Sequence, residues 1–379
     1  MTRLLSLLTT ALLCTLMLPC NYAIAQNHTE HTTLSIGNKA PDFNLPGIDG
    51  KNYSLADFKK ANILVIVFTC NHCPTAQAYE QRIIKLTTDY AAKGVQVVAI
   101  MPNDPHSVQL NELGYADTGD SFEEMKLHAQ RKRFNFPYLF DGDHEAAAIA
   151  YGPVATPHVF IFDKERILRY QGRIDDVEKP TGTPKNKDAQ NAIDALLANK
   201  EPDVKTTKVF GCSIKWKEKE DLVARSDSEW SVMPVTLDTI GENGIKSLLK
   251  NNSDKLRLIN VWATWCGPCV NELPSFVTIN RMYRKRDFEF ITISADNPEK
   301  KDKVIKTLKE LKLSNTNYLY NQDDKYKLIE AVDPNWSGAL PYTILIEPGG
   351  TIVYARQGTI DPMEMKTMIV ENALIGRFY

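Results

Sequence analysis

Residues 256–269 read LRLINVWATWCGPC, and this stretch decides the fold. Leu256 to Trp262 is a mostly apolar run, as expected of a strand that is buried in the centre of a sheet. It leads into Trp265-Cys266-Gly267-Pro268-Cys269, and a helix is expected to continue through Phe276. A Cys-x-x-Cys pair placed between a buried strand and a helix points to metal or redox chemistry.

The first half of the chain repeats this pattern. Ile63–Phe68 is a continuous apolar run, and Thr69-Cys70-Asn71-His72-Cys73-Pro74 follows it. In both halves we expect the order strand, Cys-x-x-Cys, helix, strand, helix, X-Pro, strand, turn, strand, helix; the X-Pro elements are Thr156-Pro157 and Leu340-Pro341. This order predicts an α/β protein of two tandem domains, each a mainly parallel central sheet with a terminal antiparallel hairpin and flanking helices.

The predicted domains cover residues 34–199 and 233–379, and the polar segment 200–232 is expected to link them. Within this segment, Cys212, Ile214 and Trp216 alternate with polar residues. This alternation predicts a short strand that packs on the first domain. Cys212 is then either an inert buried thiol or a third thiol that exchanges with Cys70 and Cys73.

The composition is that of a soluble globular protein, with 379 residues, 43% of them hydrophobic and 24% charged. A net charge of -2 gives no reason to expect nucleic acid or an anionic membrane surface as a partner. No Gly-rich phosphate loop or dinucleotide fingerprint stands out, so we expect no bound cofactor. Electrons would then have to come from an upstream protein donor.

Residues 1–25 predict a secretory signal peptide. Arg3 supplies a positive start, Leu4 to Leu18 is nearly unbroken apolar sequence, and Ala23-Ile24-Ala25 offers a small-x-small cleavage site. The apolar run is short for a membrane-spanning helix, and an uncleaved anchor is the alternative. We therefore expect a periplasmic or otherwise exported protein with no stable membrane insertion after cleavage.

Four of the cysteines outside the predicted signal peptide form the two Cys-x-x-Cys pairs. A cysteine at the start of a helix lies where unpaired N–H groups and the helix dipole stabilise a thiolate, the species that attacks a disulfide. A second cysteine three residues later is one helical turn away and can resolve the mixed disulfide. Cys266 and Cys70 are therefore expected to attack, and Cys269 and Cys73 to resolve.

The Trp265–Cys269 motif resembles the active site of thioredoxin. With Glu272 and Pro274 following, residues from about Met233 to Tyr379 resemble the TlpA-like exported thioredoxins. The resemblance implies a cis-proline at Pro341, beside which a substrate backbone can pair. It also implies that Glu272 assists proton movement near the buried thiol; an exposed helix carboxylate is the alternative.

The first half resembles the redoxin branch of the same superfamily, which includes alkyl hydroperoxide reductase and thiol-specific antioxidant, from about Leu34 to Leu197. Ala40-Pro41-Asp42-Phe43 matches the opening hairpin of that branch, and Pro157 matches the cis-proline. Peroxidases of this branch carry their reactive cysteine in Thr-x-x-Cys and an arginine near its sulfur. Thr69 stands directly before Cys70 and four residues before Cys73, so it forms a Thr-x-x-Cys motif with neither cysteine. Arg173 is the candidate arginine.

The residues between paired cysteines tune their reduction potential. His72 lies between Cys70 and Cys73, and a histidine there can favour the reduced, thiolate form. Electrons would then run downhill from Cys266/Cys269 to Cys70/Cys73, which we state as a relay hypothesis. The alternative is that the two domains act separately on different substrates.

Two histidines support a rival, metal-binding interpretation. His72 lies inside the first pair and His158 follows Pro157, and two thiolates with imidazoles would suit Cu(I) or zinc. The alternative for His158 is a structural role.

We expect no metal and predict an exported thiol–disulfide oxidoreductase that acts on protein disulfide or thiol substrates. Its alternatives are a copper chaperone, a thiol peroxidase, and a scaffold, which the intact cysteine pairs disfavour.

Overall fold

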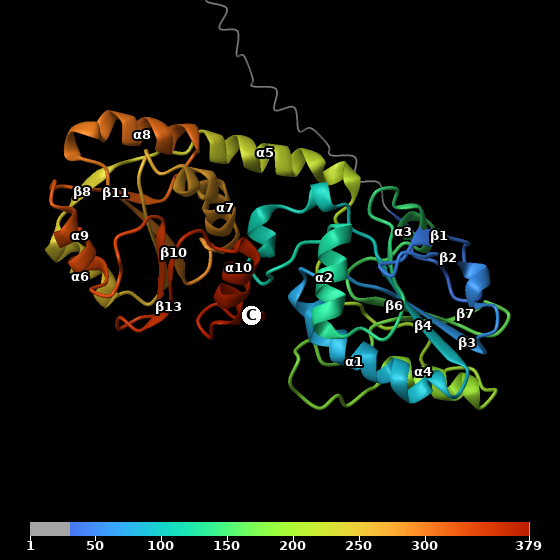
Figure 1. Cartoon of the computed structure of the whole chain (residues 1–379). Helices are drawn as coiled ribbons and strands as arrows, with labels where there is room; N and C mark the ends of the chain where they lie inside the picture. Colours follow the sequence, from blue (N-terminus) through green and yellow to red (C-terminus); the bar gives the residue numbers. More distant parts are fainter. Residues whose placement is uncertain (1–30, 379) are drawn as a thin grey trace, which may run out of the picture. The chain divides into compact units, whose positions relative to one another are not determined.

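The computed structural model describes residues 31–378 and folds them as two α/β domains, as the sequence predicts (Figure 1). The predicted signal peptide lies outside the described residues. Within 31–378, no helix combines the length and the apolar character that a membrane crossing requires.

The first domain is built on a five-stranded sheet of order β5-β4-β3-β6-β7, with β1 and β2 forming a separate hairpin. Its strands are β1 (Asn44–Pro46), β2 (Asn52–Ser54), β3 (Ile63–Phe68), β4 (Val95–Met101), β5 (Tyr138–Phe140), β6 (His158–Phe162) and β7 (Leu168–Gly172). Its helices are α1 (Pro74–Ala91), α2 (Phe122–Lys132), α3 (Ala146–Tyr151) and α4 (Asp188–Leu197), with short 3₁₀ helices η1 (Leu55–Phe58), η2 (Pro105–Ser107) and η3 (Leu110–Leu113). Strands β3, β4 and β5 pair in parallel, whereas β6 pairs antiparallel with both β3 and β7.

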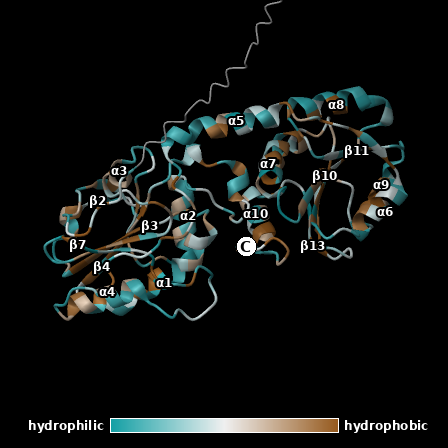
Figure 2. Ribbon diagram, turned by 180° about the vertical axis from the view of Figure 1, so that it is seen from behind, coloured by the Kyte–Doolittle hydropathy of each residue, from teal (hydrophilic) through white to brown (hydrophobic). Residues whose placement is uncertain are grey.

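The strand β3 explains why the run before the first cysteine pair is apolar at every position. Val65 and Val67 belong to a core cluster that includes residues of α1 and α4, whereas Ile66 and Phe68 belong to a second cluster with residues of β1 and α3. Figure 1 shows α1 and α4 on one side of the sheet and α3 with the β1–β2 hairpin on the other. The hydrophobic colour of Figure 2 accordingly lies along β3 and β4.

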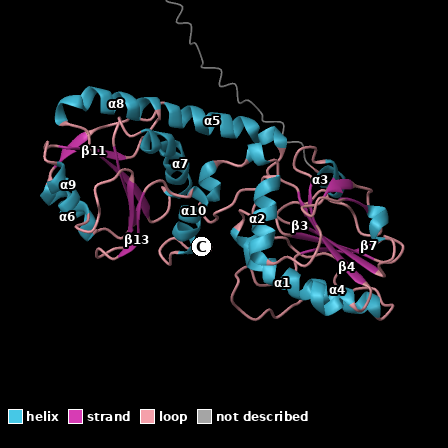
Figure 3. Ribbon diagram, in the orientation of Figure 1, coloured by secondary structure: helices cyan, strands magenta, loops and turns pink. Residues whose placement is uncertain are grey.

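The second domain has a six-stranded sheet of order β13-β12-β9-β10-β11-β8, in which β12 is antiparallel to both β9 and β13. Its strands are β8 (Asp238–Ile240), β9 (Leu256–Trp262), β10 (Phe288–Ser294), β11 (Thr316–Tyr320), β12 (Tyr342–Ile346) and β13 (Ile352–Gln357). Its helices are α6 (Glu242–Lys250), α7 (Gly267–Tyr283), α8 (Lys301–Glu310), α9 (Lys325–Val332) and α10 (Pro362–Glu371), with the 3₁₀ helix η5 (Pro298–Lys300). Helices α6 and α9 cover one face of this sheet, and α7 and α10 cover the other (Figure 3).

Both X-Pro bonds, Thr156-Pro157 and Leu340-Pro341, are cis, as the resemblance implies. Each proline directly precedes the strand that pairs antiparallel with the strand leading to the cysteine pair. The two prolines therefore serve as landmarks for aligning one site with the other.

Part of the segment predicted as a linker, residues 200–232, forms regular structure and packs on the first domain. It contains the 3₁₀ helix η4 (Lys217–Lys219) and the helix α5 (Glu220–Ser231). Before them, Cys212 forms a single antiparallel bridge with Thr156, in place of the predicted short strand. Ile214 is 1% exposed and belongs to the core cluster on the α3 side of the first sheet, so this segment does pack on the first domain.

Candidate redox sites

In the second domain, the cysteine pair lies where β9 gives way to α7. Cys266 is the N-cap residue of α7, and its Sγ accepts a hydrogen bond from the backbone N–H of Cys269 at 3.3 Å. The two cysteines form a disulfide with a Cα–Cα distance of 5.3 Å. Trp265 beside them is 68% exposed, whereas Cys266 and Cys269 are buried.

Glu272 lies in α7 one turn beyond Cys269, and it is buried, so it is not the exposed helix carboxylate of the alternative. Its Oε1 accepts from Asn260 Nδ2, and its Oε2 accepts from the backbone N–H of Ile360, each at 3.1 Å. Burial raises the pKa of Glu272, and the two hydrogen bonds oppose this rise only in part. A buried carboxyl with a raised pKa can hold and release a proton beside the thiols.

The cis-prolines show that the two Cys-x-x-Cys pairs are not in the same register. Val261 pairs with Tyr342, the residue after Pro341, and Phe68 pairs with His158, the residue after Pro157. Counting five residues onward from each strand residue gives Cys266 (261 + 5) and Cys73 (68 + 5). The second cysteine of the first pair therefore matches the first cysteine of the second pair.

Helix boundaries agree with this register. Cys73, like Cys266, is the N-cap residue of the helix that follows it. Cys70 lies before helix α1, whereas Cys269 lies inside the first turn of α7. The expectation that Cys70 opens the helix and Cys73 follows one turn later is therefore wrong, because α1 begins at Pro74. Proline is favoured in the first turn, where its missing N–H costs no hydrogen bond.

The two thiols of the first pair are free and lie around Thr156. Cys70 Sγ is 3.0 Å from Thr156 Oγ1, and Cys73 Sγ can donate to the Thr156 carbonyl at 3.4 Å. As a thiolate, Cys73 can accept the backbone N–H of Cys212, which points at its sulfur at 3.3 Å. Cys70 is 2% exposed and Cys73 0%, so this site is covered.

The surroundings favour ionisation of Cys73 over Cys70. Burial raises the pKa of the Cys70 thiol, and its hydrogen bond to Cys73 and the charge of Asp120 raise it further. Burial also opposes ionisation of Cys73, but hydrogen bonds from the Cys212 and Cys70 thiols and the charge of His72 outweigh it. The pKa of Cys73 is therefore held below its usual range, and the thiolate belongs on the helix-capping cysteine.

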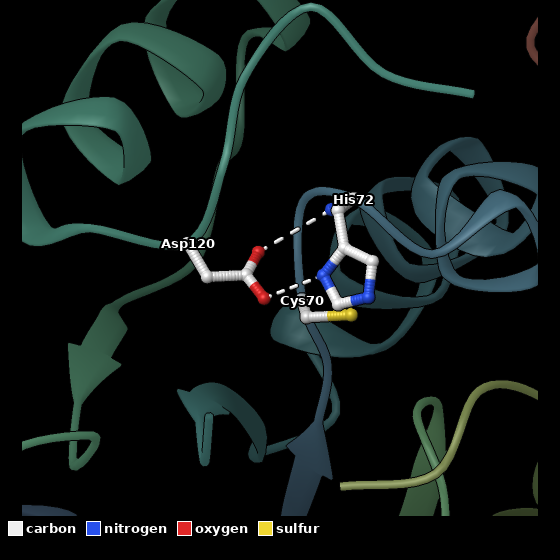
Figure 4. A group of neighbouring side chains, drawn as sticks. All are labelled: Cys70, His72 and Asp120. Atoms are coloured by element: carbon white, nitrogen blue, oxygen red, sulfur yellow. Dashed lines mark hydrogen bonds and ion pairs between the residues drawn. The ribbon is translucent and has the colours of Figure 1, made fainter. Parts of the chain in front are cut away.

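His72 is held by a buried carboxylate that the sequence does not reveal. His72 Nδ1 lies 2.6 Å from Asp120 Oδ2, and the His72 backbone N–H donates to Asp120 Oδ1 at 3.3 Å (Figure 4). Burial alone lowers the pKa of His72, but the charge and hydrogen bond of Asp120 outweigh it and raise that pKa. Asp120 lies 48 residues along the chain from His72, just before the N-cap residue of α2, and no spacing rule connects the two.

Cys70, His72 and Asp120 also offer ligand atoms within 4.8 Å of one another, as a metal site requires. Asp120, however, already accepts from His72, from Asn103 Nδ2 and from the backbone N–H of Asn71. Within residues 31–378, His72 Nε2 has no hydrogen-bond partner. Metal binding here would thus use Cys70 and His72 Nε2 most directly, while Asp120 would have to release its donors.

The other two residues proposed for metal or peroxide chemistry have different partners. His158 Nδ1 accepts from the backbone N–H of Val154 at 3.3 Å, and its Nε2 lies 2.9 Å from Gln171 Oε1. Burial lowers the pKa of His158 to about 4, so this ring is neutral near pH 7, and both of its nitrogens already have partners. Arg173 Nε donates to Asp188 at 2.7 Å.

Both halves of the chain match known family models. The model described as the AhpC/TSA family matches residues 36–171, and the model described as Redoxin matches residues 229–374. A candidate peroxiredoxin of Mycobacterium tuberculosis is 31% identical over 128 residues, which cover 33% of this chain and 69% of the relative. The thiol-disulfide oxidoreductase ResA of Geobacillus thermodenitrificans is 24% identical over 190 residues, which cover 49% of this chain and 93% of the relative.

Solved structures give matches of similar extent. An uncharacterised conserved protein of Geobacillus kaustophilus is 36% identical, with coverage of 49% of this chain and 94% of that chain and a TM-score of 0.44. A hypothetical protein of Sinorhizobium meliloti 1021 is 33% identical, with coverage of 49% and 97% and the same TM-score of 0.44.

The hydrogen bond from Asn260 is one of two that lower the pKa of Glu272 against the rise caused by burial. We predict that Asn260→Ala raises the pKa of Glu272 further, because one of the two donors to its carboxylate is lost. Since the folded-state pKa lies above the unfolded value, the free energy of unfolding falls as the pH rises from the unfolded pKa through the folded pKa, and in the variant this fall extends to higher pH. Carbon-13 NMR titration of the Glu side chains measures the shift. The exposed Asn321→Ala is the control, and an unchanged or lower Glu272 pKa in Asn260→Ala would contradict the assignment.

Proposed function

Because the chain belongs to the AhpC/TSA and redoxin family, with two thioredoxin-like domains in tandem, we propose that it is an exported thiol–disulfide oxidoreductase with one exchange site in each domain. The observation that carries the proposal is a cysteine at the N-cap of the helix after the central strand, found in both domains beside a cis-proline. Export rests on the predicted signal peptide in residues 1–25. Proteins with disulfides or thiols are the proposed substrates.

In the second domain, the reduced Cys266 thiolate attacks a substrate disulfide. A bond forms between Cys266 Sγ and one substrate sulfur, and the other substrate sulfur leaves as a thiolate. Cys269 then attacks Cys266 Sγ, which releases the second substrate thiol and forms the Cys266–Cys269 disulfide seen in the structure. The proton of Cys269 passes to Glu272, whose raised pKa makes it a competent acceptor one turn away.

In the first domain, the same roles fall to different members of the pair. Cys73 attacks, because it caps α1 and carries the lowered pKa, and Cys70 resolves from the loop before the helix. Asp120 raises the pKa of His72, and the charge of His72 in turn stabilises the Cys73 thiolate and so favours the reduced form of this pair. A stabilised reduced form makes the disulfide more oxidising, which supports a relay of electrons from Cys266/Cys269 to Cys70/Cys73.

Peroxide reduction by the first domain is a second candidate, and the register favours it. Cys70 stands three residues before Cys73, at the place of threonine in the Thr-x-x-Cys motif that the redoxin resemblance implies. Cys73 thiolate would attack one peroxide oxygen to give Cys73 sulfenic acid and an alcohol or water, and Cys70 would then form a disulfide with loss of water. In Cys70→Ser/Cys212→Ser, where no neighbouring thiol can condense with the sulfenic acid, hydrogen peroxide followed by dimedone should label Cys73. Labelling no faster than that of a free thiol argues against this activity.

Trapping experiments test which cysteine attacks. With Cys266, Cys269 and Cys212 changed to Ser, so that no third thiol can remove the adduct, we predict that Cys70→Ser accumulates a mixed disulfide with a substrate protein through Cys73, whereas Cys73→Ser accumulates none, because Cys70 stays protonated near neutral pH. Peptide mass mapping after acid quenching identifies the linked cysteine. A mixed disulfide through Cys70 in the Cys73→Ser variant, with none in Cys70→Ser, would restore the opposite assignment.

Reduction potentials test the relay. We predict a lower potential for Cys266/Cys269 than for Cys70/Cys73, measured in glutathione buffers on metal-free protein with the other pair changed to Ser. His72→Asn should lower the first-domain potential by roughly 30 mV, the equivalent of about one pKa unit on the thiolate. The exposed His106→Asn is the matched control and should leave the potential unchanged. Equal or reversed potentials of the two pairs would mean that the domains act separately.

A further inference from the structure

A segment that follows the last helix of the first domain, residues 205–216, lies across the Cys70/Cys73 site. It first pairs with the edge strand β7, where the backbone N–H of Gln171 donates to Lys205 O at 3.0 Å. It then pairs with Thr156, and it ends at Lys215, whose backbone N–H donates to Asn103 Oδ1 at 2.9 Å. The segment is therefore held at both ends and in the middle, where Cys212 lies.

Cys212 contacts the attacking sulfur directly. The backbone N–H of Thr156 donates to Cys212 O at 2.9 Å, and the backbone N–H of Cys212 donates to Cys73 Sγ at 3.3 Å. The Cys212 and Cys73 side chains also form a hydrogen bond with each other. An inert core thiol needs none of these contacts with a reactive cysteine.

The second domain lacks such a strand in the part of the chain that the structure describes. Leu340, which precedes the cis-proline as Thr156 does, takes part in no strand pairing within residues 31–378. Trp265 and the Gly267-Pro268 dipeptide are exposed there, whereas every residue from Cys70 to Pro74 is buried. An extended peptide binds such an unpaired backbone edge through main-chain hydrogen bonds. In the first domain, the strand that carries Cys212 pairs with the residue before the cis-proline, where the second domain leaves the corresponding backbone of Leu340 without strand pairing within residues 31–378.

Gly211 allows the close approach of this strand. Its φ of +147° is rarely adopted by other residues, and a Cβ at this position would lie 1.9 Å from Thr156 O. Phe210 on one side packs against Tyr79, with ring centroids 6.2 Å apart, and Ile214 on the other side is buried in the core. Gly211 thus lets the strand approach Thr156 closely, and the packing of Phe210 and Ile214 holds the strand on either side of it.

From these contacts we propose that Cys212 is a third redox-active cysteine, carried on a built-in substrate strand, that exchanges with Cys73. The proposal rests on the proposed exchange activity of the first domain. Starting from the Cys70–Cys73 disulfide, the deprotonated Cys212 sulfur attacks Cys73 Sγ. The Cys73–Cys212 bond forms, the Cys70–Cys73 bond breaks, and Cys70 leaves as a thiolate that takes up the proton lost by Cys212. This isomerisation needs no further oxidant, and its reversal frees Cys212.

The same attack resolves an external mixed disulfide on Cys73. Cys212 forms a bond to Cys73 Sγ, and the external thiol leaves with a proton, so one disulfide replaces another. The strand also has to move aside before a protein substrate can pair with Thr156, which makes entry to the first site depend on displacing residues 210–214.

The test uses the full-length Cys70→Ser protein, reduced and then exposed to glutathione disulfide as the probe. After acid quenching and alkylation, peptide mass mapping should find Cys73 joined to Cys212. In Cys70→Ser/Cys212→Ser, the Cys73–glutathione adduct should accumulate at least about tenfold more, because the intramolecular thiol that removes it is absent. Equal adduct levels in the two variants, with Cys212 free in Cys70→Ser, would overturn the proposal.

Gly211→Ala in the Cys70→Ser background provides a second readout that keeps the Cys212 thiol. The added Cβ pushes the strand away from Thr156, so the Cys73–Cys212 disulfide should fall and glutathione should reach Cys73 faster. An unchanged yield of the Cys73–Cys212 disulfide would contradict the claim that the close approach of Gly211 to Thr156 places Cys212 next to Cys73. If Cys73 forms no adduct in any of the three variants, the proposed exchange activity of the first domain is overturned as well. If the Cys73–glutathione adduct persists while Cys212 stays a free thiol, only the proposed redox role of Cys212 is overturned.

Discussion

Both sites depend on one constraint, the position of a sulfur at the N-terminus of the helix that follows the central strand. The backbone N–H groups of a first helical turn have no partners inside the helix, and they favour a negative charge in front of them. Cys266 and Cys73 occupy this position in their respective domains. The buried strands β9 and β3 hold the sulfurs there, because each strand is fixed between layers of core side chains and ends a few residues before the cysteine.

Cys266 and Cys73 share this position at the start of a helix, but they differ in the place of the partner cysteine, in the nearby charged groups and in exposure. In the second domain the partner cysteine follows inside the helix, the carboxyl of Glu272 is at hand for a proton, and the neighbouring surface is exposed. In the first domain the partner precedes the helix, a buried His72–Asp120 pair supplies charge, and the strand that carries Cys212 covers the sulfur. An open site suits exchange with varied proteins, whereas a covered, charge-stabilised site suits a restricted partner or an internal one.

Sequence reasoning predicted the two α/β domains, the strands before the cysteines and both cis-prolines. It missed the register of the first pair, because Cys70-x-x-Cys73 and Cys266-x-x-Cys269 have identical spacing and only the start of the helix at Pro74 separates them. Asp120 and Asn260 were also missed, since each meets its partner through tertiary folding and not through helical or strand spacing. The alternation around Cys212 did predict packing on the first domain, but it carried no information about the neighbouring sulfur.

The most direct test of the account is the order in which the five cysteines of the described chain ionise. Carbon-13 NMR of the cysteine Cβ atoms, followed against pH in the fully reduced wild-type protein, reports each thiol separately. The account predicts that Cys73 and Cys266 titrate below about 8.5, the value of an unperturbed thiol, and that Cys70 and Cys212 titrate above it. Ionisation of Cys70 before Cys73 would contradict it, because the position at the start of the helix would then not decide which sulfur reacts.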